Sequence, residues 1–182
     1  MRAAWIALIW LAACAPAPQA PGELEPVELS DIAEAAPTLS AEGYGPIRIG
    51  MSREDAAAAF GQTLLLNGAA DPACEGYVFE PGVGPEGMRF LALDGAIARI
   101  SDHGSQNLLT DAGIAVGAGI DAVRTAYAGA EESGVEDGPG RVLTAWRESG
   151  ALGLRFWFDG EGRVTEMAAG TREALLLTEG CS

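Results

Sequence analysis

The chain contains a single histidine, His103, and it follows two other side chains able to do chemistry, Ser101 and Asp102. Serine, histidine and aspartate make up a hydrolytic triad, in which the base activates the nucleophile and the carboxylate orients the base. Triad members normally come from separate segments, and adjacent residues at the end of one strand point in different directions. We therefore expect His103 to be a solvated loop residue and the chain not to be an enzyme.

The remaining polar residues do not form the pattern of a metal or cofactor site. Neither Cys74 nor Cys181 has the spacing of a zinc ligand. Asp94 and Asp159 precede glycine at expected turns, where backbone geometry favours this pair, and no calcium loop is visible. The run Gly82–Pro85 lacks the strand-to-helix context of a phosphate loop. We expect no metal and no cofactor, while the 26 acidic residues leave a paired-carboxylate glycosidase open.

Cys74 and Cys181 are expected to form a disulfide. Cys14 closes an apolar leader, so an even pair remains for an exported domain, and an oxidising compartment favours the bridge. The two residues are 107 positions apart. Closing a loop of that size contributes about 4 to 5 kcal/mol in the chain-entropy model. Two free thiols are the alternative.

Residues 1–13 have the features of an export signal. Arg2 supplies a positive charge, and the apolar run after it is shorter than the about 20 residues that span a bilayer. The run ends Leu11-Ala12-Ala13-Cys14, which resembles the lipobox of bacterial lipoproteins. The resemblance implies cleavage before Cys14 and acylation of that residue with chains such as palmitate, which would give a stable anchor. A secreted protein with a chance cysteine is the alternative.

The residue after the lipobox and the overall charge indicate a location and exclude some partners. Ala15 stands where an aspartate would signal retention at the inner membrane, so the resemblance implies the periplasmic side of the outer membrane. The formal net charge of −15 becomes −16 when Arg2 leaves with the leader. Nucleic acid and anionic headgroups bind clusters of Lys and Arg, and no such cluster is visible. The expected partners are the bilayer, through Cys14, and an envelope protein.

Composition divides the remaining chain into a tether and one domain. Residues 14–41 are rich in proline and acidic residues, which extend a chain and leave little to bury, so we expect a disordered tether. Residues 42–182 are apolar and punctuated by glycine, and their number suits one domain.

The domain contains an internal similarity. A constant shift of 67 positions superimposes chemically similar residues: Ile47 on Ile114, Ile49 on Val116, Gly50 on Gly117, Ala56 on Val123 and Phe60 on Tyr127. This predicts an α+β fold of two tandem repeats, residues 43–109 and 110–180. Each repeat is expected to hold a short helix packed on an antiparallel meander. Ser52 and Asp55 favour a helix start, and Asp94-Gly95 favours a hairpin.

The opening Ile47-Arg48-Ile49-Gly50-Met51-Ser52 before a helix resembles the small outer-membrane lipoproteins of the BamE (SmpA/OmlA) group, and two such units in tandem resemble the β-lactamase inhibitor protein fold. This resemblance implies that a concave sheet face binds a partner through aromatic side chains. The aromatic residues on expected strands are the candidates by strand position only, and core positions suit them better: Tyr77, Phe79, Trp146 and Trp157.

Three functions are compatible with these features. The first is a non-enzymatic lipoprotein of the outer membrane that acts by protein contact, as an envelope scaffold or assembly factor. The second is an inhibitor or binder of an exported enzyme, which an exposed aromatic patch would favour. The third is a small-ligand carrier or enzyme, which requires a pocket with converging polar groups.

Overall fold

The computed structural model describes residues 36–68, 71, 73–104, 108–134, 140–177 and 181. The chain divides into two units, Met1–Glu34 and Ala35–Ser182, and all described residues belong to the second. The leader, Cys14 and most of the expected tether lie outside the described residues. Within the described ranges, no helix is both long enough and apolar enough to cross a membrane.

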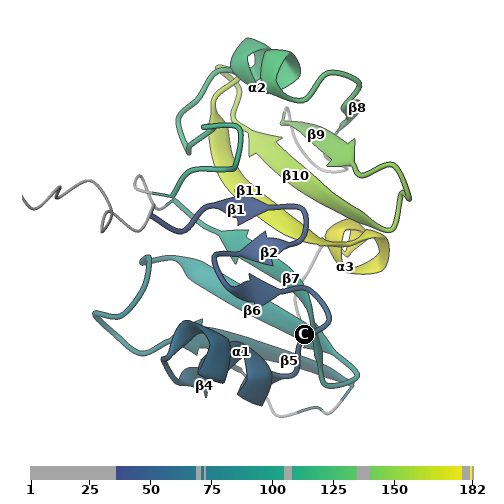
Figure 1. Ribbon diagram of the computed structural model, residues 1–182. Coiled ribbons are helices and arrows are strands. Elements are labelled where there is room, and N and C mark those ends of the chain that lie inside the picture. Colours follow the sequence, from purple (N-terminus) through teal and green to yellow (C-terminus); the bar gives the residue numbers. More distant parts are fainter. Residues whose placement is uncertain are drawn as a thin grey trace, which may run out of the picture. The chain divides into compact units, whose positions relative to one another are not determined.

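One antiparallel sheet of eight strands forms the frame of the second unit (Figure 1). Its strands lie side by side in the order β4-β5-β6-β7-β11-β10-β9-β8. Their bounds are Leu64–Leu66 for β4, Cys74–Phe79 for β5, Met88–Leu93 for β6, Ala96–Asp102 for β7, Glu131–Gly134 for β8, Arg141–Trp146 for β9, Leu152–Phe158 for β10 and Val164–Thr171 for β11. The expected α+β class is confirmed.

A helix followed by four strands occurs twice along the chain. The helix α1 (Arg53–Phe60) precedes β4 to β7, and α2 (Ile120–Ala126) precedes β8 to β11. The two sets of strands meet at the centre of the sheet, where β7 pairs with β11. In this pairing Ser101 lies opposite Ala168, which is the residue 67 positions later in the chain.

The start of α1 follows from its sequence. Alanine is the strongest helix former, and four alanines fill the middle of the helix. The Ser52 hydroxyl accepts a hydrogen bond from the Asp55 amide at 3.1 Å, so the expected capping pair is confirmed. The helix ends at Gly61, whose φ of 73° is the left-handed conformation that glycine adopts at low cost.

The two Asp-Gly turns differ. Asp94 and Gly95, with φ of 49° and 79°, close a tight hairpin between β6 and β7, as expected. The turn between β10 and β11 is longer, and the Asp159 carboxylate stabilises it by accepting from the amides of Glu161 and Arg163 at 3.1 and 2.8 Å.

The main core lies between one face of the sheet and the two longer helices. Phe60 of α1 packs on Phe79 with ring centroids 4.7 Å apart, and Phe79 packs on Phe90 at 5.1 Å. Behind α2, Tyr127 packs on Phe156 at 5.2 Å in the same way. Each half therefore buries one helix against its own strands.

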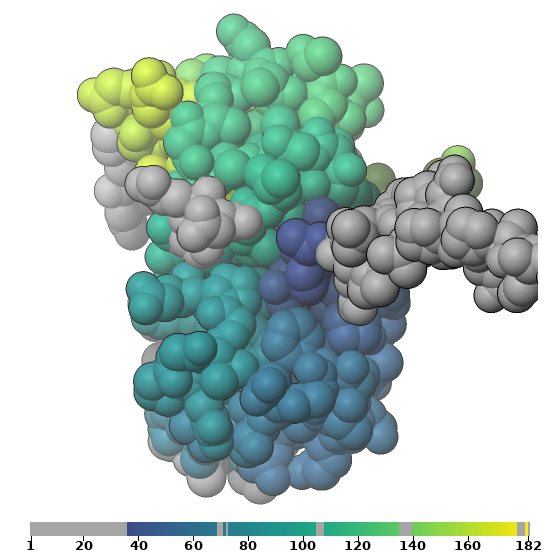
Figure 2. Space-filling model, turned by 60° about the vertical axis from the view of Figure 1, so that its left-hand side comes forward, coloured from purple at the N-terminus to yellow at the C-terminus, as the bar shows by residue number. Residues whose placement is uncertain are grey.

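A separate three-stranded sheet covers the middle of this face. Its strands are β1 (Leu39–Ser40), β2 (Gly43–Tyr44) and β3 (Ile47–Arg48). In Figure 2 their purple residues lie between the blue residues of the first half and the green residues of the second. Leu39 and Ile47 are fully buried there. Residues 39–41, which the sequence assigned to the tether, thus belong to the folded part.

Several elements had no counterpart in the sequence prediction. The edge strands β4 and β8 are short, and β8 consists of Glu131–Gly134, residues without the alternation of a half-buried strand. The helix α3 (Arg172–Leu176) was not expected either. Its Thr171 cap accepts from the Ala174 amide at 3.2 Å.

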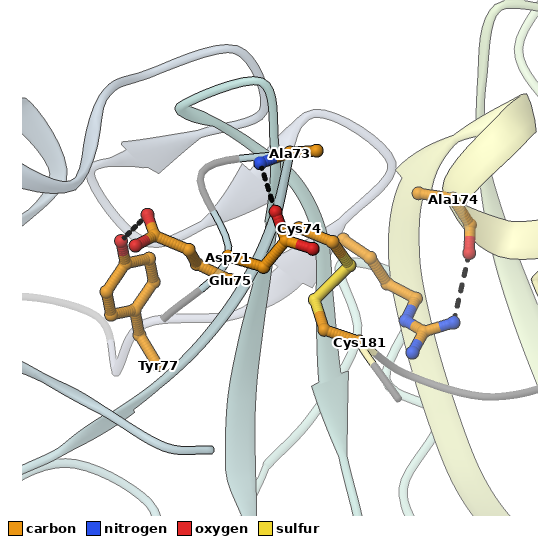
Figure 3. Close-up of a disulfide and its surroundings, with 8 residues drawn as sticks. Asp71, Ala73, Cys74, Glu75, Tyr77, Ala174 and Cys181 are labelled. Carbon is orange, nitrogen blue, oxygen red and sulfur yellow. Dashed lines mark hydrogen bonds between the residues drawn. A yellow bond between two sulfur atoms is a disulfide. The ribbon is translucent and has the colours of Figure 1, made fainter. Parts of the chain in front are cut away.

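On the face opposite α1 and α2, a disulfide ties the end of the chain to β5. Cys74 and Cys181 are bonded, which confirms the expected bridge (Figure 3). Both sulfurs pack against a small cluster of buried side chains: Leu91, Ala98 and Ala174. The bridge and α3 together cover part of this second face.

Replacing both Cys74 and Cys181 by serine should lower the free energy of unfolding by about 2 to 5 kcal/mol, because the bridge closes a loop of 107 residues. Urea denaturation of the soluble domain measures this difference. A reducing agent should destabilise the native protein to a similar extent and leave the double variant unchanged. Equal stability of the oxidised native protein and the variant would contradict the structural role.

Candidate functional site

The sheet has two chemically different faces. Side chains alternate across a strand, so every second residue points away from α1 and α2. We call the face that points away the open face, because α3 and the chain end cover it only in part. The register places the following functional side chains on it: Arg89, Arg99, Ser101, His103, Trp146, Arg155, Trp157 and Glu166.

A cavity of about 300 Å³ opens on this face at the junction of the two halves. Its polar lining comes from both halves: Arg89, Arg99, Ser101, His103 and Glu166. Its apolar lining includes Leu91, Trp157 and Leu177. Gly76 forms part of the wall, and a Cβ there would lie 2.7 Å from the Asn67 carbonyl oxygen, so only glycine fits.

Three of the polar side chains form a chain of contacts across β7 and β11. His103 Nδ1 lies 3.3 Å from Glu166 Oε2, and Ser101 Oγ lies 3.3 Å from His103 Nε2. Alternation puts Ser101 and His103 on one face, two residues apart, whereas Asp102 points to the other. His103 is 39% exposed, as expected, yet it contacts two side chains and is not an isolated loop residue.

Burial shifts the pKa values of Glu166 and His103. Withdrawal from water raises the pKa of Glu166 to about 7, against the opposing effect of Arg99 and Arg89. The pKa of His103 is lowered, first by burial and then by Arg89 and Arg99. Both shifts favour the uncharged forms, so the contact between the two residues holds at neutral pH as a hydrogen bond more than as an ion pair.

Two arginines of the site also hold α3 and the chain end. Arg99 Nη1 donates to the carbonyls of Ala174 and Leu177 at 3.0 and 3.2 Å, and Figure 3 shows Ala174 beside the disulfide. Arg155 Nη1 donates to the Leu175 carbonyl at 2.6 Å. These carbonyls lack partners within the helix, and cations near a helix C-terminus are stabilising.

Arg89 differs from the other two arginines. It is exposed and lines the cavity from β6, opposite Ser101 in the neighbouring strand. Among the residues that the structure describes, no hydrogen bond or ion pair engages its side chain. Of the three arginines, it is therefore the one whose guanidinium group is not engaged by the described part of the fold.

The four aromatic candidates divide between the two faces. Tyr77 and Phe79 point toward α1 and are 4% and 6% exposed, so they lie in the core, which is the alternative expected for them from the sequence. Trp146 and Trp157 lie on the open face, half-buried. Each carries a guanidinium over its ring: that of Arg172 at 3.9 Å and that of Arg155 at 5.2 Å.

Sequence reasoning missed most of the site. Glu166 and Arg99 are 67 positions apart, which is the shift of the internal similarity, and Arg89 and Arg155 lie in the similar runs 88–90 and 154–156. The internal similarity could thus have paired these charges. Nothing in the sequence states that β7 and β11 lie side by side, which is what brings them together.

The comparisons with known proteins do not place the chain in a family. No family model matches it, and no curated protein matches it. Among solved structures it is similar to an extracellular protein with an SCP domain from Bacillus anthracis, at 11% identity and a TM-score of 0.47 over 70% of this chain and 45% of that one. It is also similar to a cysteine-rich secretory protein from Staphylococcus aureus, at 13% identity and a TM-score of 0.44 over 70% and 46%.

The chain therefore spans less than half the length of either structure. The expected resemblance to the BamE group and the β-lactamase inhibitor protein is wrong, because the similar structures are SCP-domain and cysteine-rich secretory proteins. The run Ile47–Ser52 suggested that resemblance. Its residues form a strand outside the main sheet and the cap of α1, and such local features occur in many folds.

Replacing Glu166 by glutamine should change how stability depends on pH. The folded protein keeps the Glu166 proton up to about pH 7, whereas the unfolded chain loses it near 4.5, so this group lowers stability as pH rises between these values. Above pH 7 the variant should be more stable by on the order of 1 to 3 kcal/mol. Denaturation across pH 5 to 8, with Glu161→Gln as the surface control, tests this. If the stability of Glu166→Gln depends on pH in the same way as that of the native protein, the burial of this carboxyl group is contradicted.

Proposed function

We propose that this chain is an exported, non-enzymatic binding protein that acts by contact through its open face. The observation that carries the proposal is the gathering of charged and aromatic side chains around one cavity at the junction of β7 and β11. Burying such groups is costly, and a fold that needs only a core would fill these positions with apolar residues. Perturbed pKa values in a concave site are typical of functional positions.

The leader supports a location in the cell envelope. A short apolar run ending in Leu11-Ala12-Ala13-Cys14 suits export and acylation of Cys14, and the following Ala15 suits the outer membrane. The tether after Cys14 would hold the domain away from the bilayer on its periplasmic side. A disulfide between Cys74 and Cys181 suits an oxidising compartment.

We also infer that the two halves are tandem repeats. A shift of 67 positions carries β5 onto β9 and the start of α1 onto the start of α2. Three positions of β7 and its extension then correspond to β11: Arg99 to Glu166, Ser101 to Ala168 and His103 to Gly170. In this reading the second repeat has small residues, Ala168 and Gly170, opposite polar ones of the first, which leaves room for a cavity on the axis between them.

Within this function, an envelope protein is the partner that the anchor favours, in a scaffold or assembly role. Inhibition of an exported enzyme is the alternative, in which the half-buried rings of Trp146 and Trp157 would contribute to the interface. Both roles use the same face, so one capture experiment addresses them together.

An acyl hydrolase is the second candidate, because Ser101, His103 and Glu166 follow the order of nucleophile, base and carboxylate. Three features disfavour it. Ser101 is only 3% exposed, its contact with His103 is longer than the usual 2.6 to 3.2 Å, and an uncharged Glu166 stabilises a protonated histidine poorly.

We expect any hydrolysis of p-nitrophenyl acetate by the soluble domain to be unaffected by Ser101→Ala. A serine that acted as nucleophile would lower turnover by about 100-fold or more when removed. The measurement is the initial rate at pH 8, with Ser133→Ala as the control. A selective loss in the Ser101 variant would replace the binding proposal with the hydrolase.

A photo-crosslinking amino acid at Val78 on the open face should capture an envelope protein in intact cells, whereas the same group at Arg124 on α2 should not. The captured protein is identified by mass spectrometry. In the Cys14→Ser background the chain should move to the soluble fraction and the capture should be lost. The same products from both positions, or none from a correctly anchored protein, would contradict contact through the open face.

A further inference from the structure

We propose that the cavity on the open face is a carboxylate-binding site, with the Arg89 guanidinium as its principal contact and Trp157 as its apolar wall. This inference rests on the proposed binding function and names the chemistry that the face recognises. The ligand is a singly charged carboxylate, supplied either by a small organic acid or by the free C-terminus or an acidic side chain of a polypeptide.

The first support is the distribution of charge. The chain has no lysine, and two of its eleven basic residues, Arg89 and Arg99, line this one cavity, while Arg155 on the adjoining β10 acts on Glu166 of the same cavity. Glu166 lines the same cavity, and the charge of the buried Asp102 acts on it. In a chain of net charge −15 this is a local excess of positive charge, and it suits an anion.

The second support is the hydrogen-bonding capacity that the fold leaves unused. Arg89 makes no hydrogen bond or ion pair within the described residues, as set out above. Arg99 and Arg155 use only Nη1 for α3 and the chain end in that same part of the chain, and the Nε atoms of both are buried without a hydrogen-bond partner there. A guanidinium presents planar pairs of donors, which match the two oxygens of a carboxylate.

The shape of the cavity favours a monoanion with an apolar body. Its volume of about 300 Å³ suits a small acid or a single side chain. Leu91, Leu177 and the ring of Trp157 offer apolar contact beside the charged groups. A doubly charged phosphate would meet stronger repulsion from Glu166 and from the acidic surface of the whole chain, so a carboxylate fits better.

The protonation of Glu166 gives the site a second property. The charged groups around it are Arg89 on β6, Arg99 and Asp102 on β7, Arg155 on β10 and, just beyond β7, His103. A protonated Glu166 can donate a hydrogen bond to an incoming carboxylate, whereas an ionised one repels it. Binding should therefore be coupled to proton uptake and weaken as pH rises through about 7.

The test uses the mature soluble domain in a Trp146→Phe background, in which Trp157 is the remaining tryptophan. Benzoate is titrated up to about 10 mM while Trp157 fluorescence is recorded, with benzamide as the uncharged isostere and inorganic phosphate as the competing anion. Saturable binding of benzoate, at least tenfold tighter than that of benzamide or phosphate, is expected. No saturation, or equal binding of the amide or of phosphate, overturns the proposal.

Arg89→Gln should weaken benzoate binding at least tenfold, whereas Arg124→Gln removes one positive charge from α2 and should change it less than twofold. Glu166→Gln should abolish the loss of affinity between pH 6 and 8. Circular dichroism of each variant confirms folding, and Arg89 is exposed, so its replacement leaves the core intact. If both arginine variants weaken benzoate binding equally, the effect comes from net charge alone and the proposed site is overturned.

A dipeptide with a free C-terminus, compared with its amide, distinguishes a polypeptide source from a small acid. Tighter binding of the free dipeptide than of benzoate assigns the site to a chain terminus, and the reverse assigns it to a small acid. If Arg89→Gln binds benzoate as tightly as the native domain and the protein captured from Val78 is still captured, the binding function stands and the carboxylate inference falls. If Arg89→Gln loses both benzoate binding and the capture of the protein from Val78, Arg89 belongs to the partner interface.

Discussion

The antiparallel pairing of β7 with β11 is the constraint on which the rest of the domain depends. It joins two four-stranded sets into one sheet and sets Ser101 against Ala168 at its centre. Because side-chain direction alternates along a strand, this register also decides which residues meet on each face. A shift of one residue would exchange the faces and bury Arg99 and Glu166 in the core.

The helices cover one face of the sheet, and polar side chains gather on the other. The helices α1 and α2, together with β1 to β3, bury the aromatic residues on their side. On the open face, α3 and the chain end bury part of the charge, and their unpaired carbonyls accept from Arg99 and Arg155. The disulfide at Cys181 keeps that cover in place, so the stability of the chain end and the electrostatics of the cavity are linked.

The site is asymmetric although the two halves share their order of elements. On the central strands the first half supplies the cation, hydroxyl and imidazole, and the second supplies a carboxylate and small residues. Gly170 illustrates why small residues matter, since a Cβ there would lie 2.5 Å from the Ala98 carbonyl oxygen and 3.3 Å from the Arg99 Cβ. Residues of both halves line the cavity, which gives a physical reason for them to stay in one chain.

The sequence by itself determined the local features of the domain. The cap at Ser52, the end of α1 at Gly61, the hairpin at Asp94-Gly95 and the pairing of Cys74 with Cys181 depend on neighbouring residues or on simple counting. Local signals were also the source of error, since a six-residue opening suggested the wrong family. Only the tertiary structure decided the site, because Arg89, Glu166 and His103 come from β6, β11 and the residue after β7, and no local pattern encodes the order and facing of these strands. It also decided that Tyr77 and Trp157, alike as strand aromatics, lie on opposite faces, since that depends on register across the whole sheet.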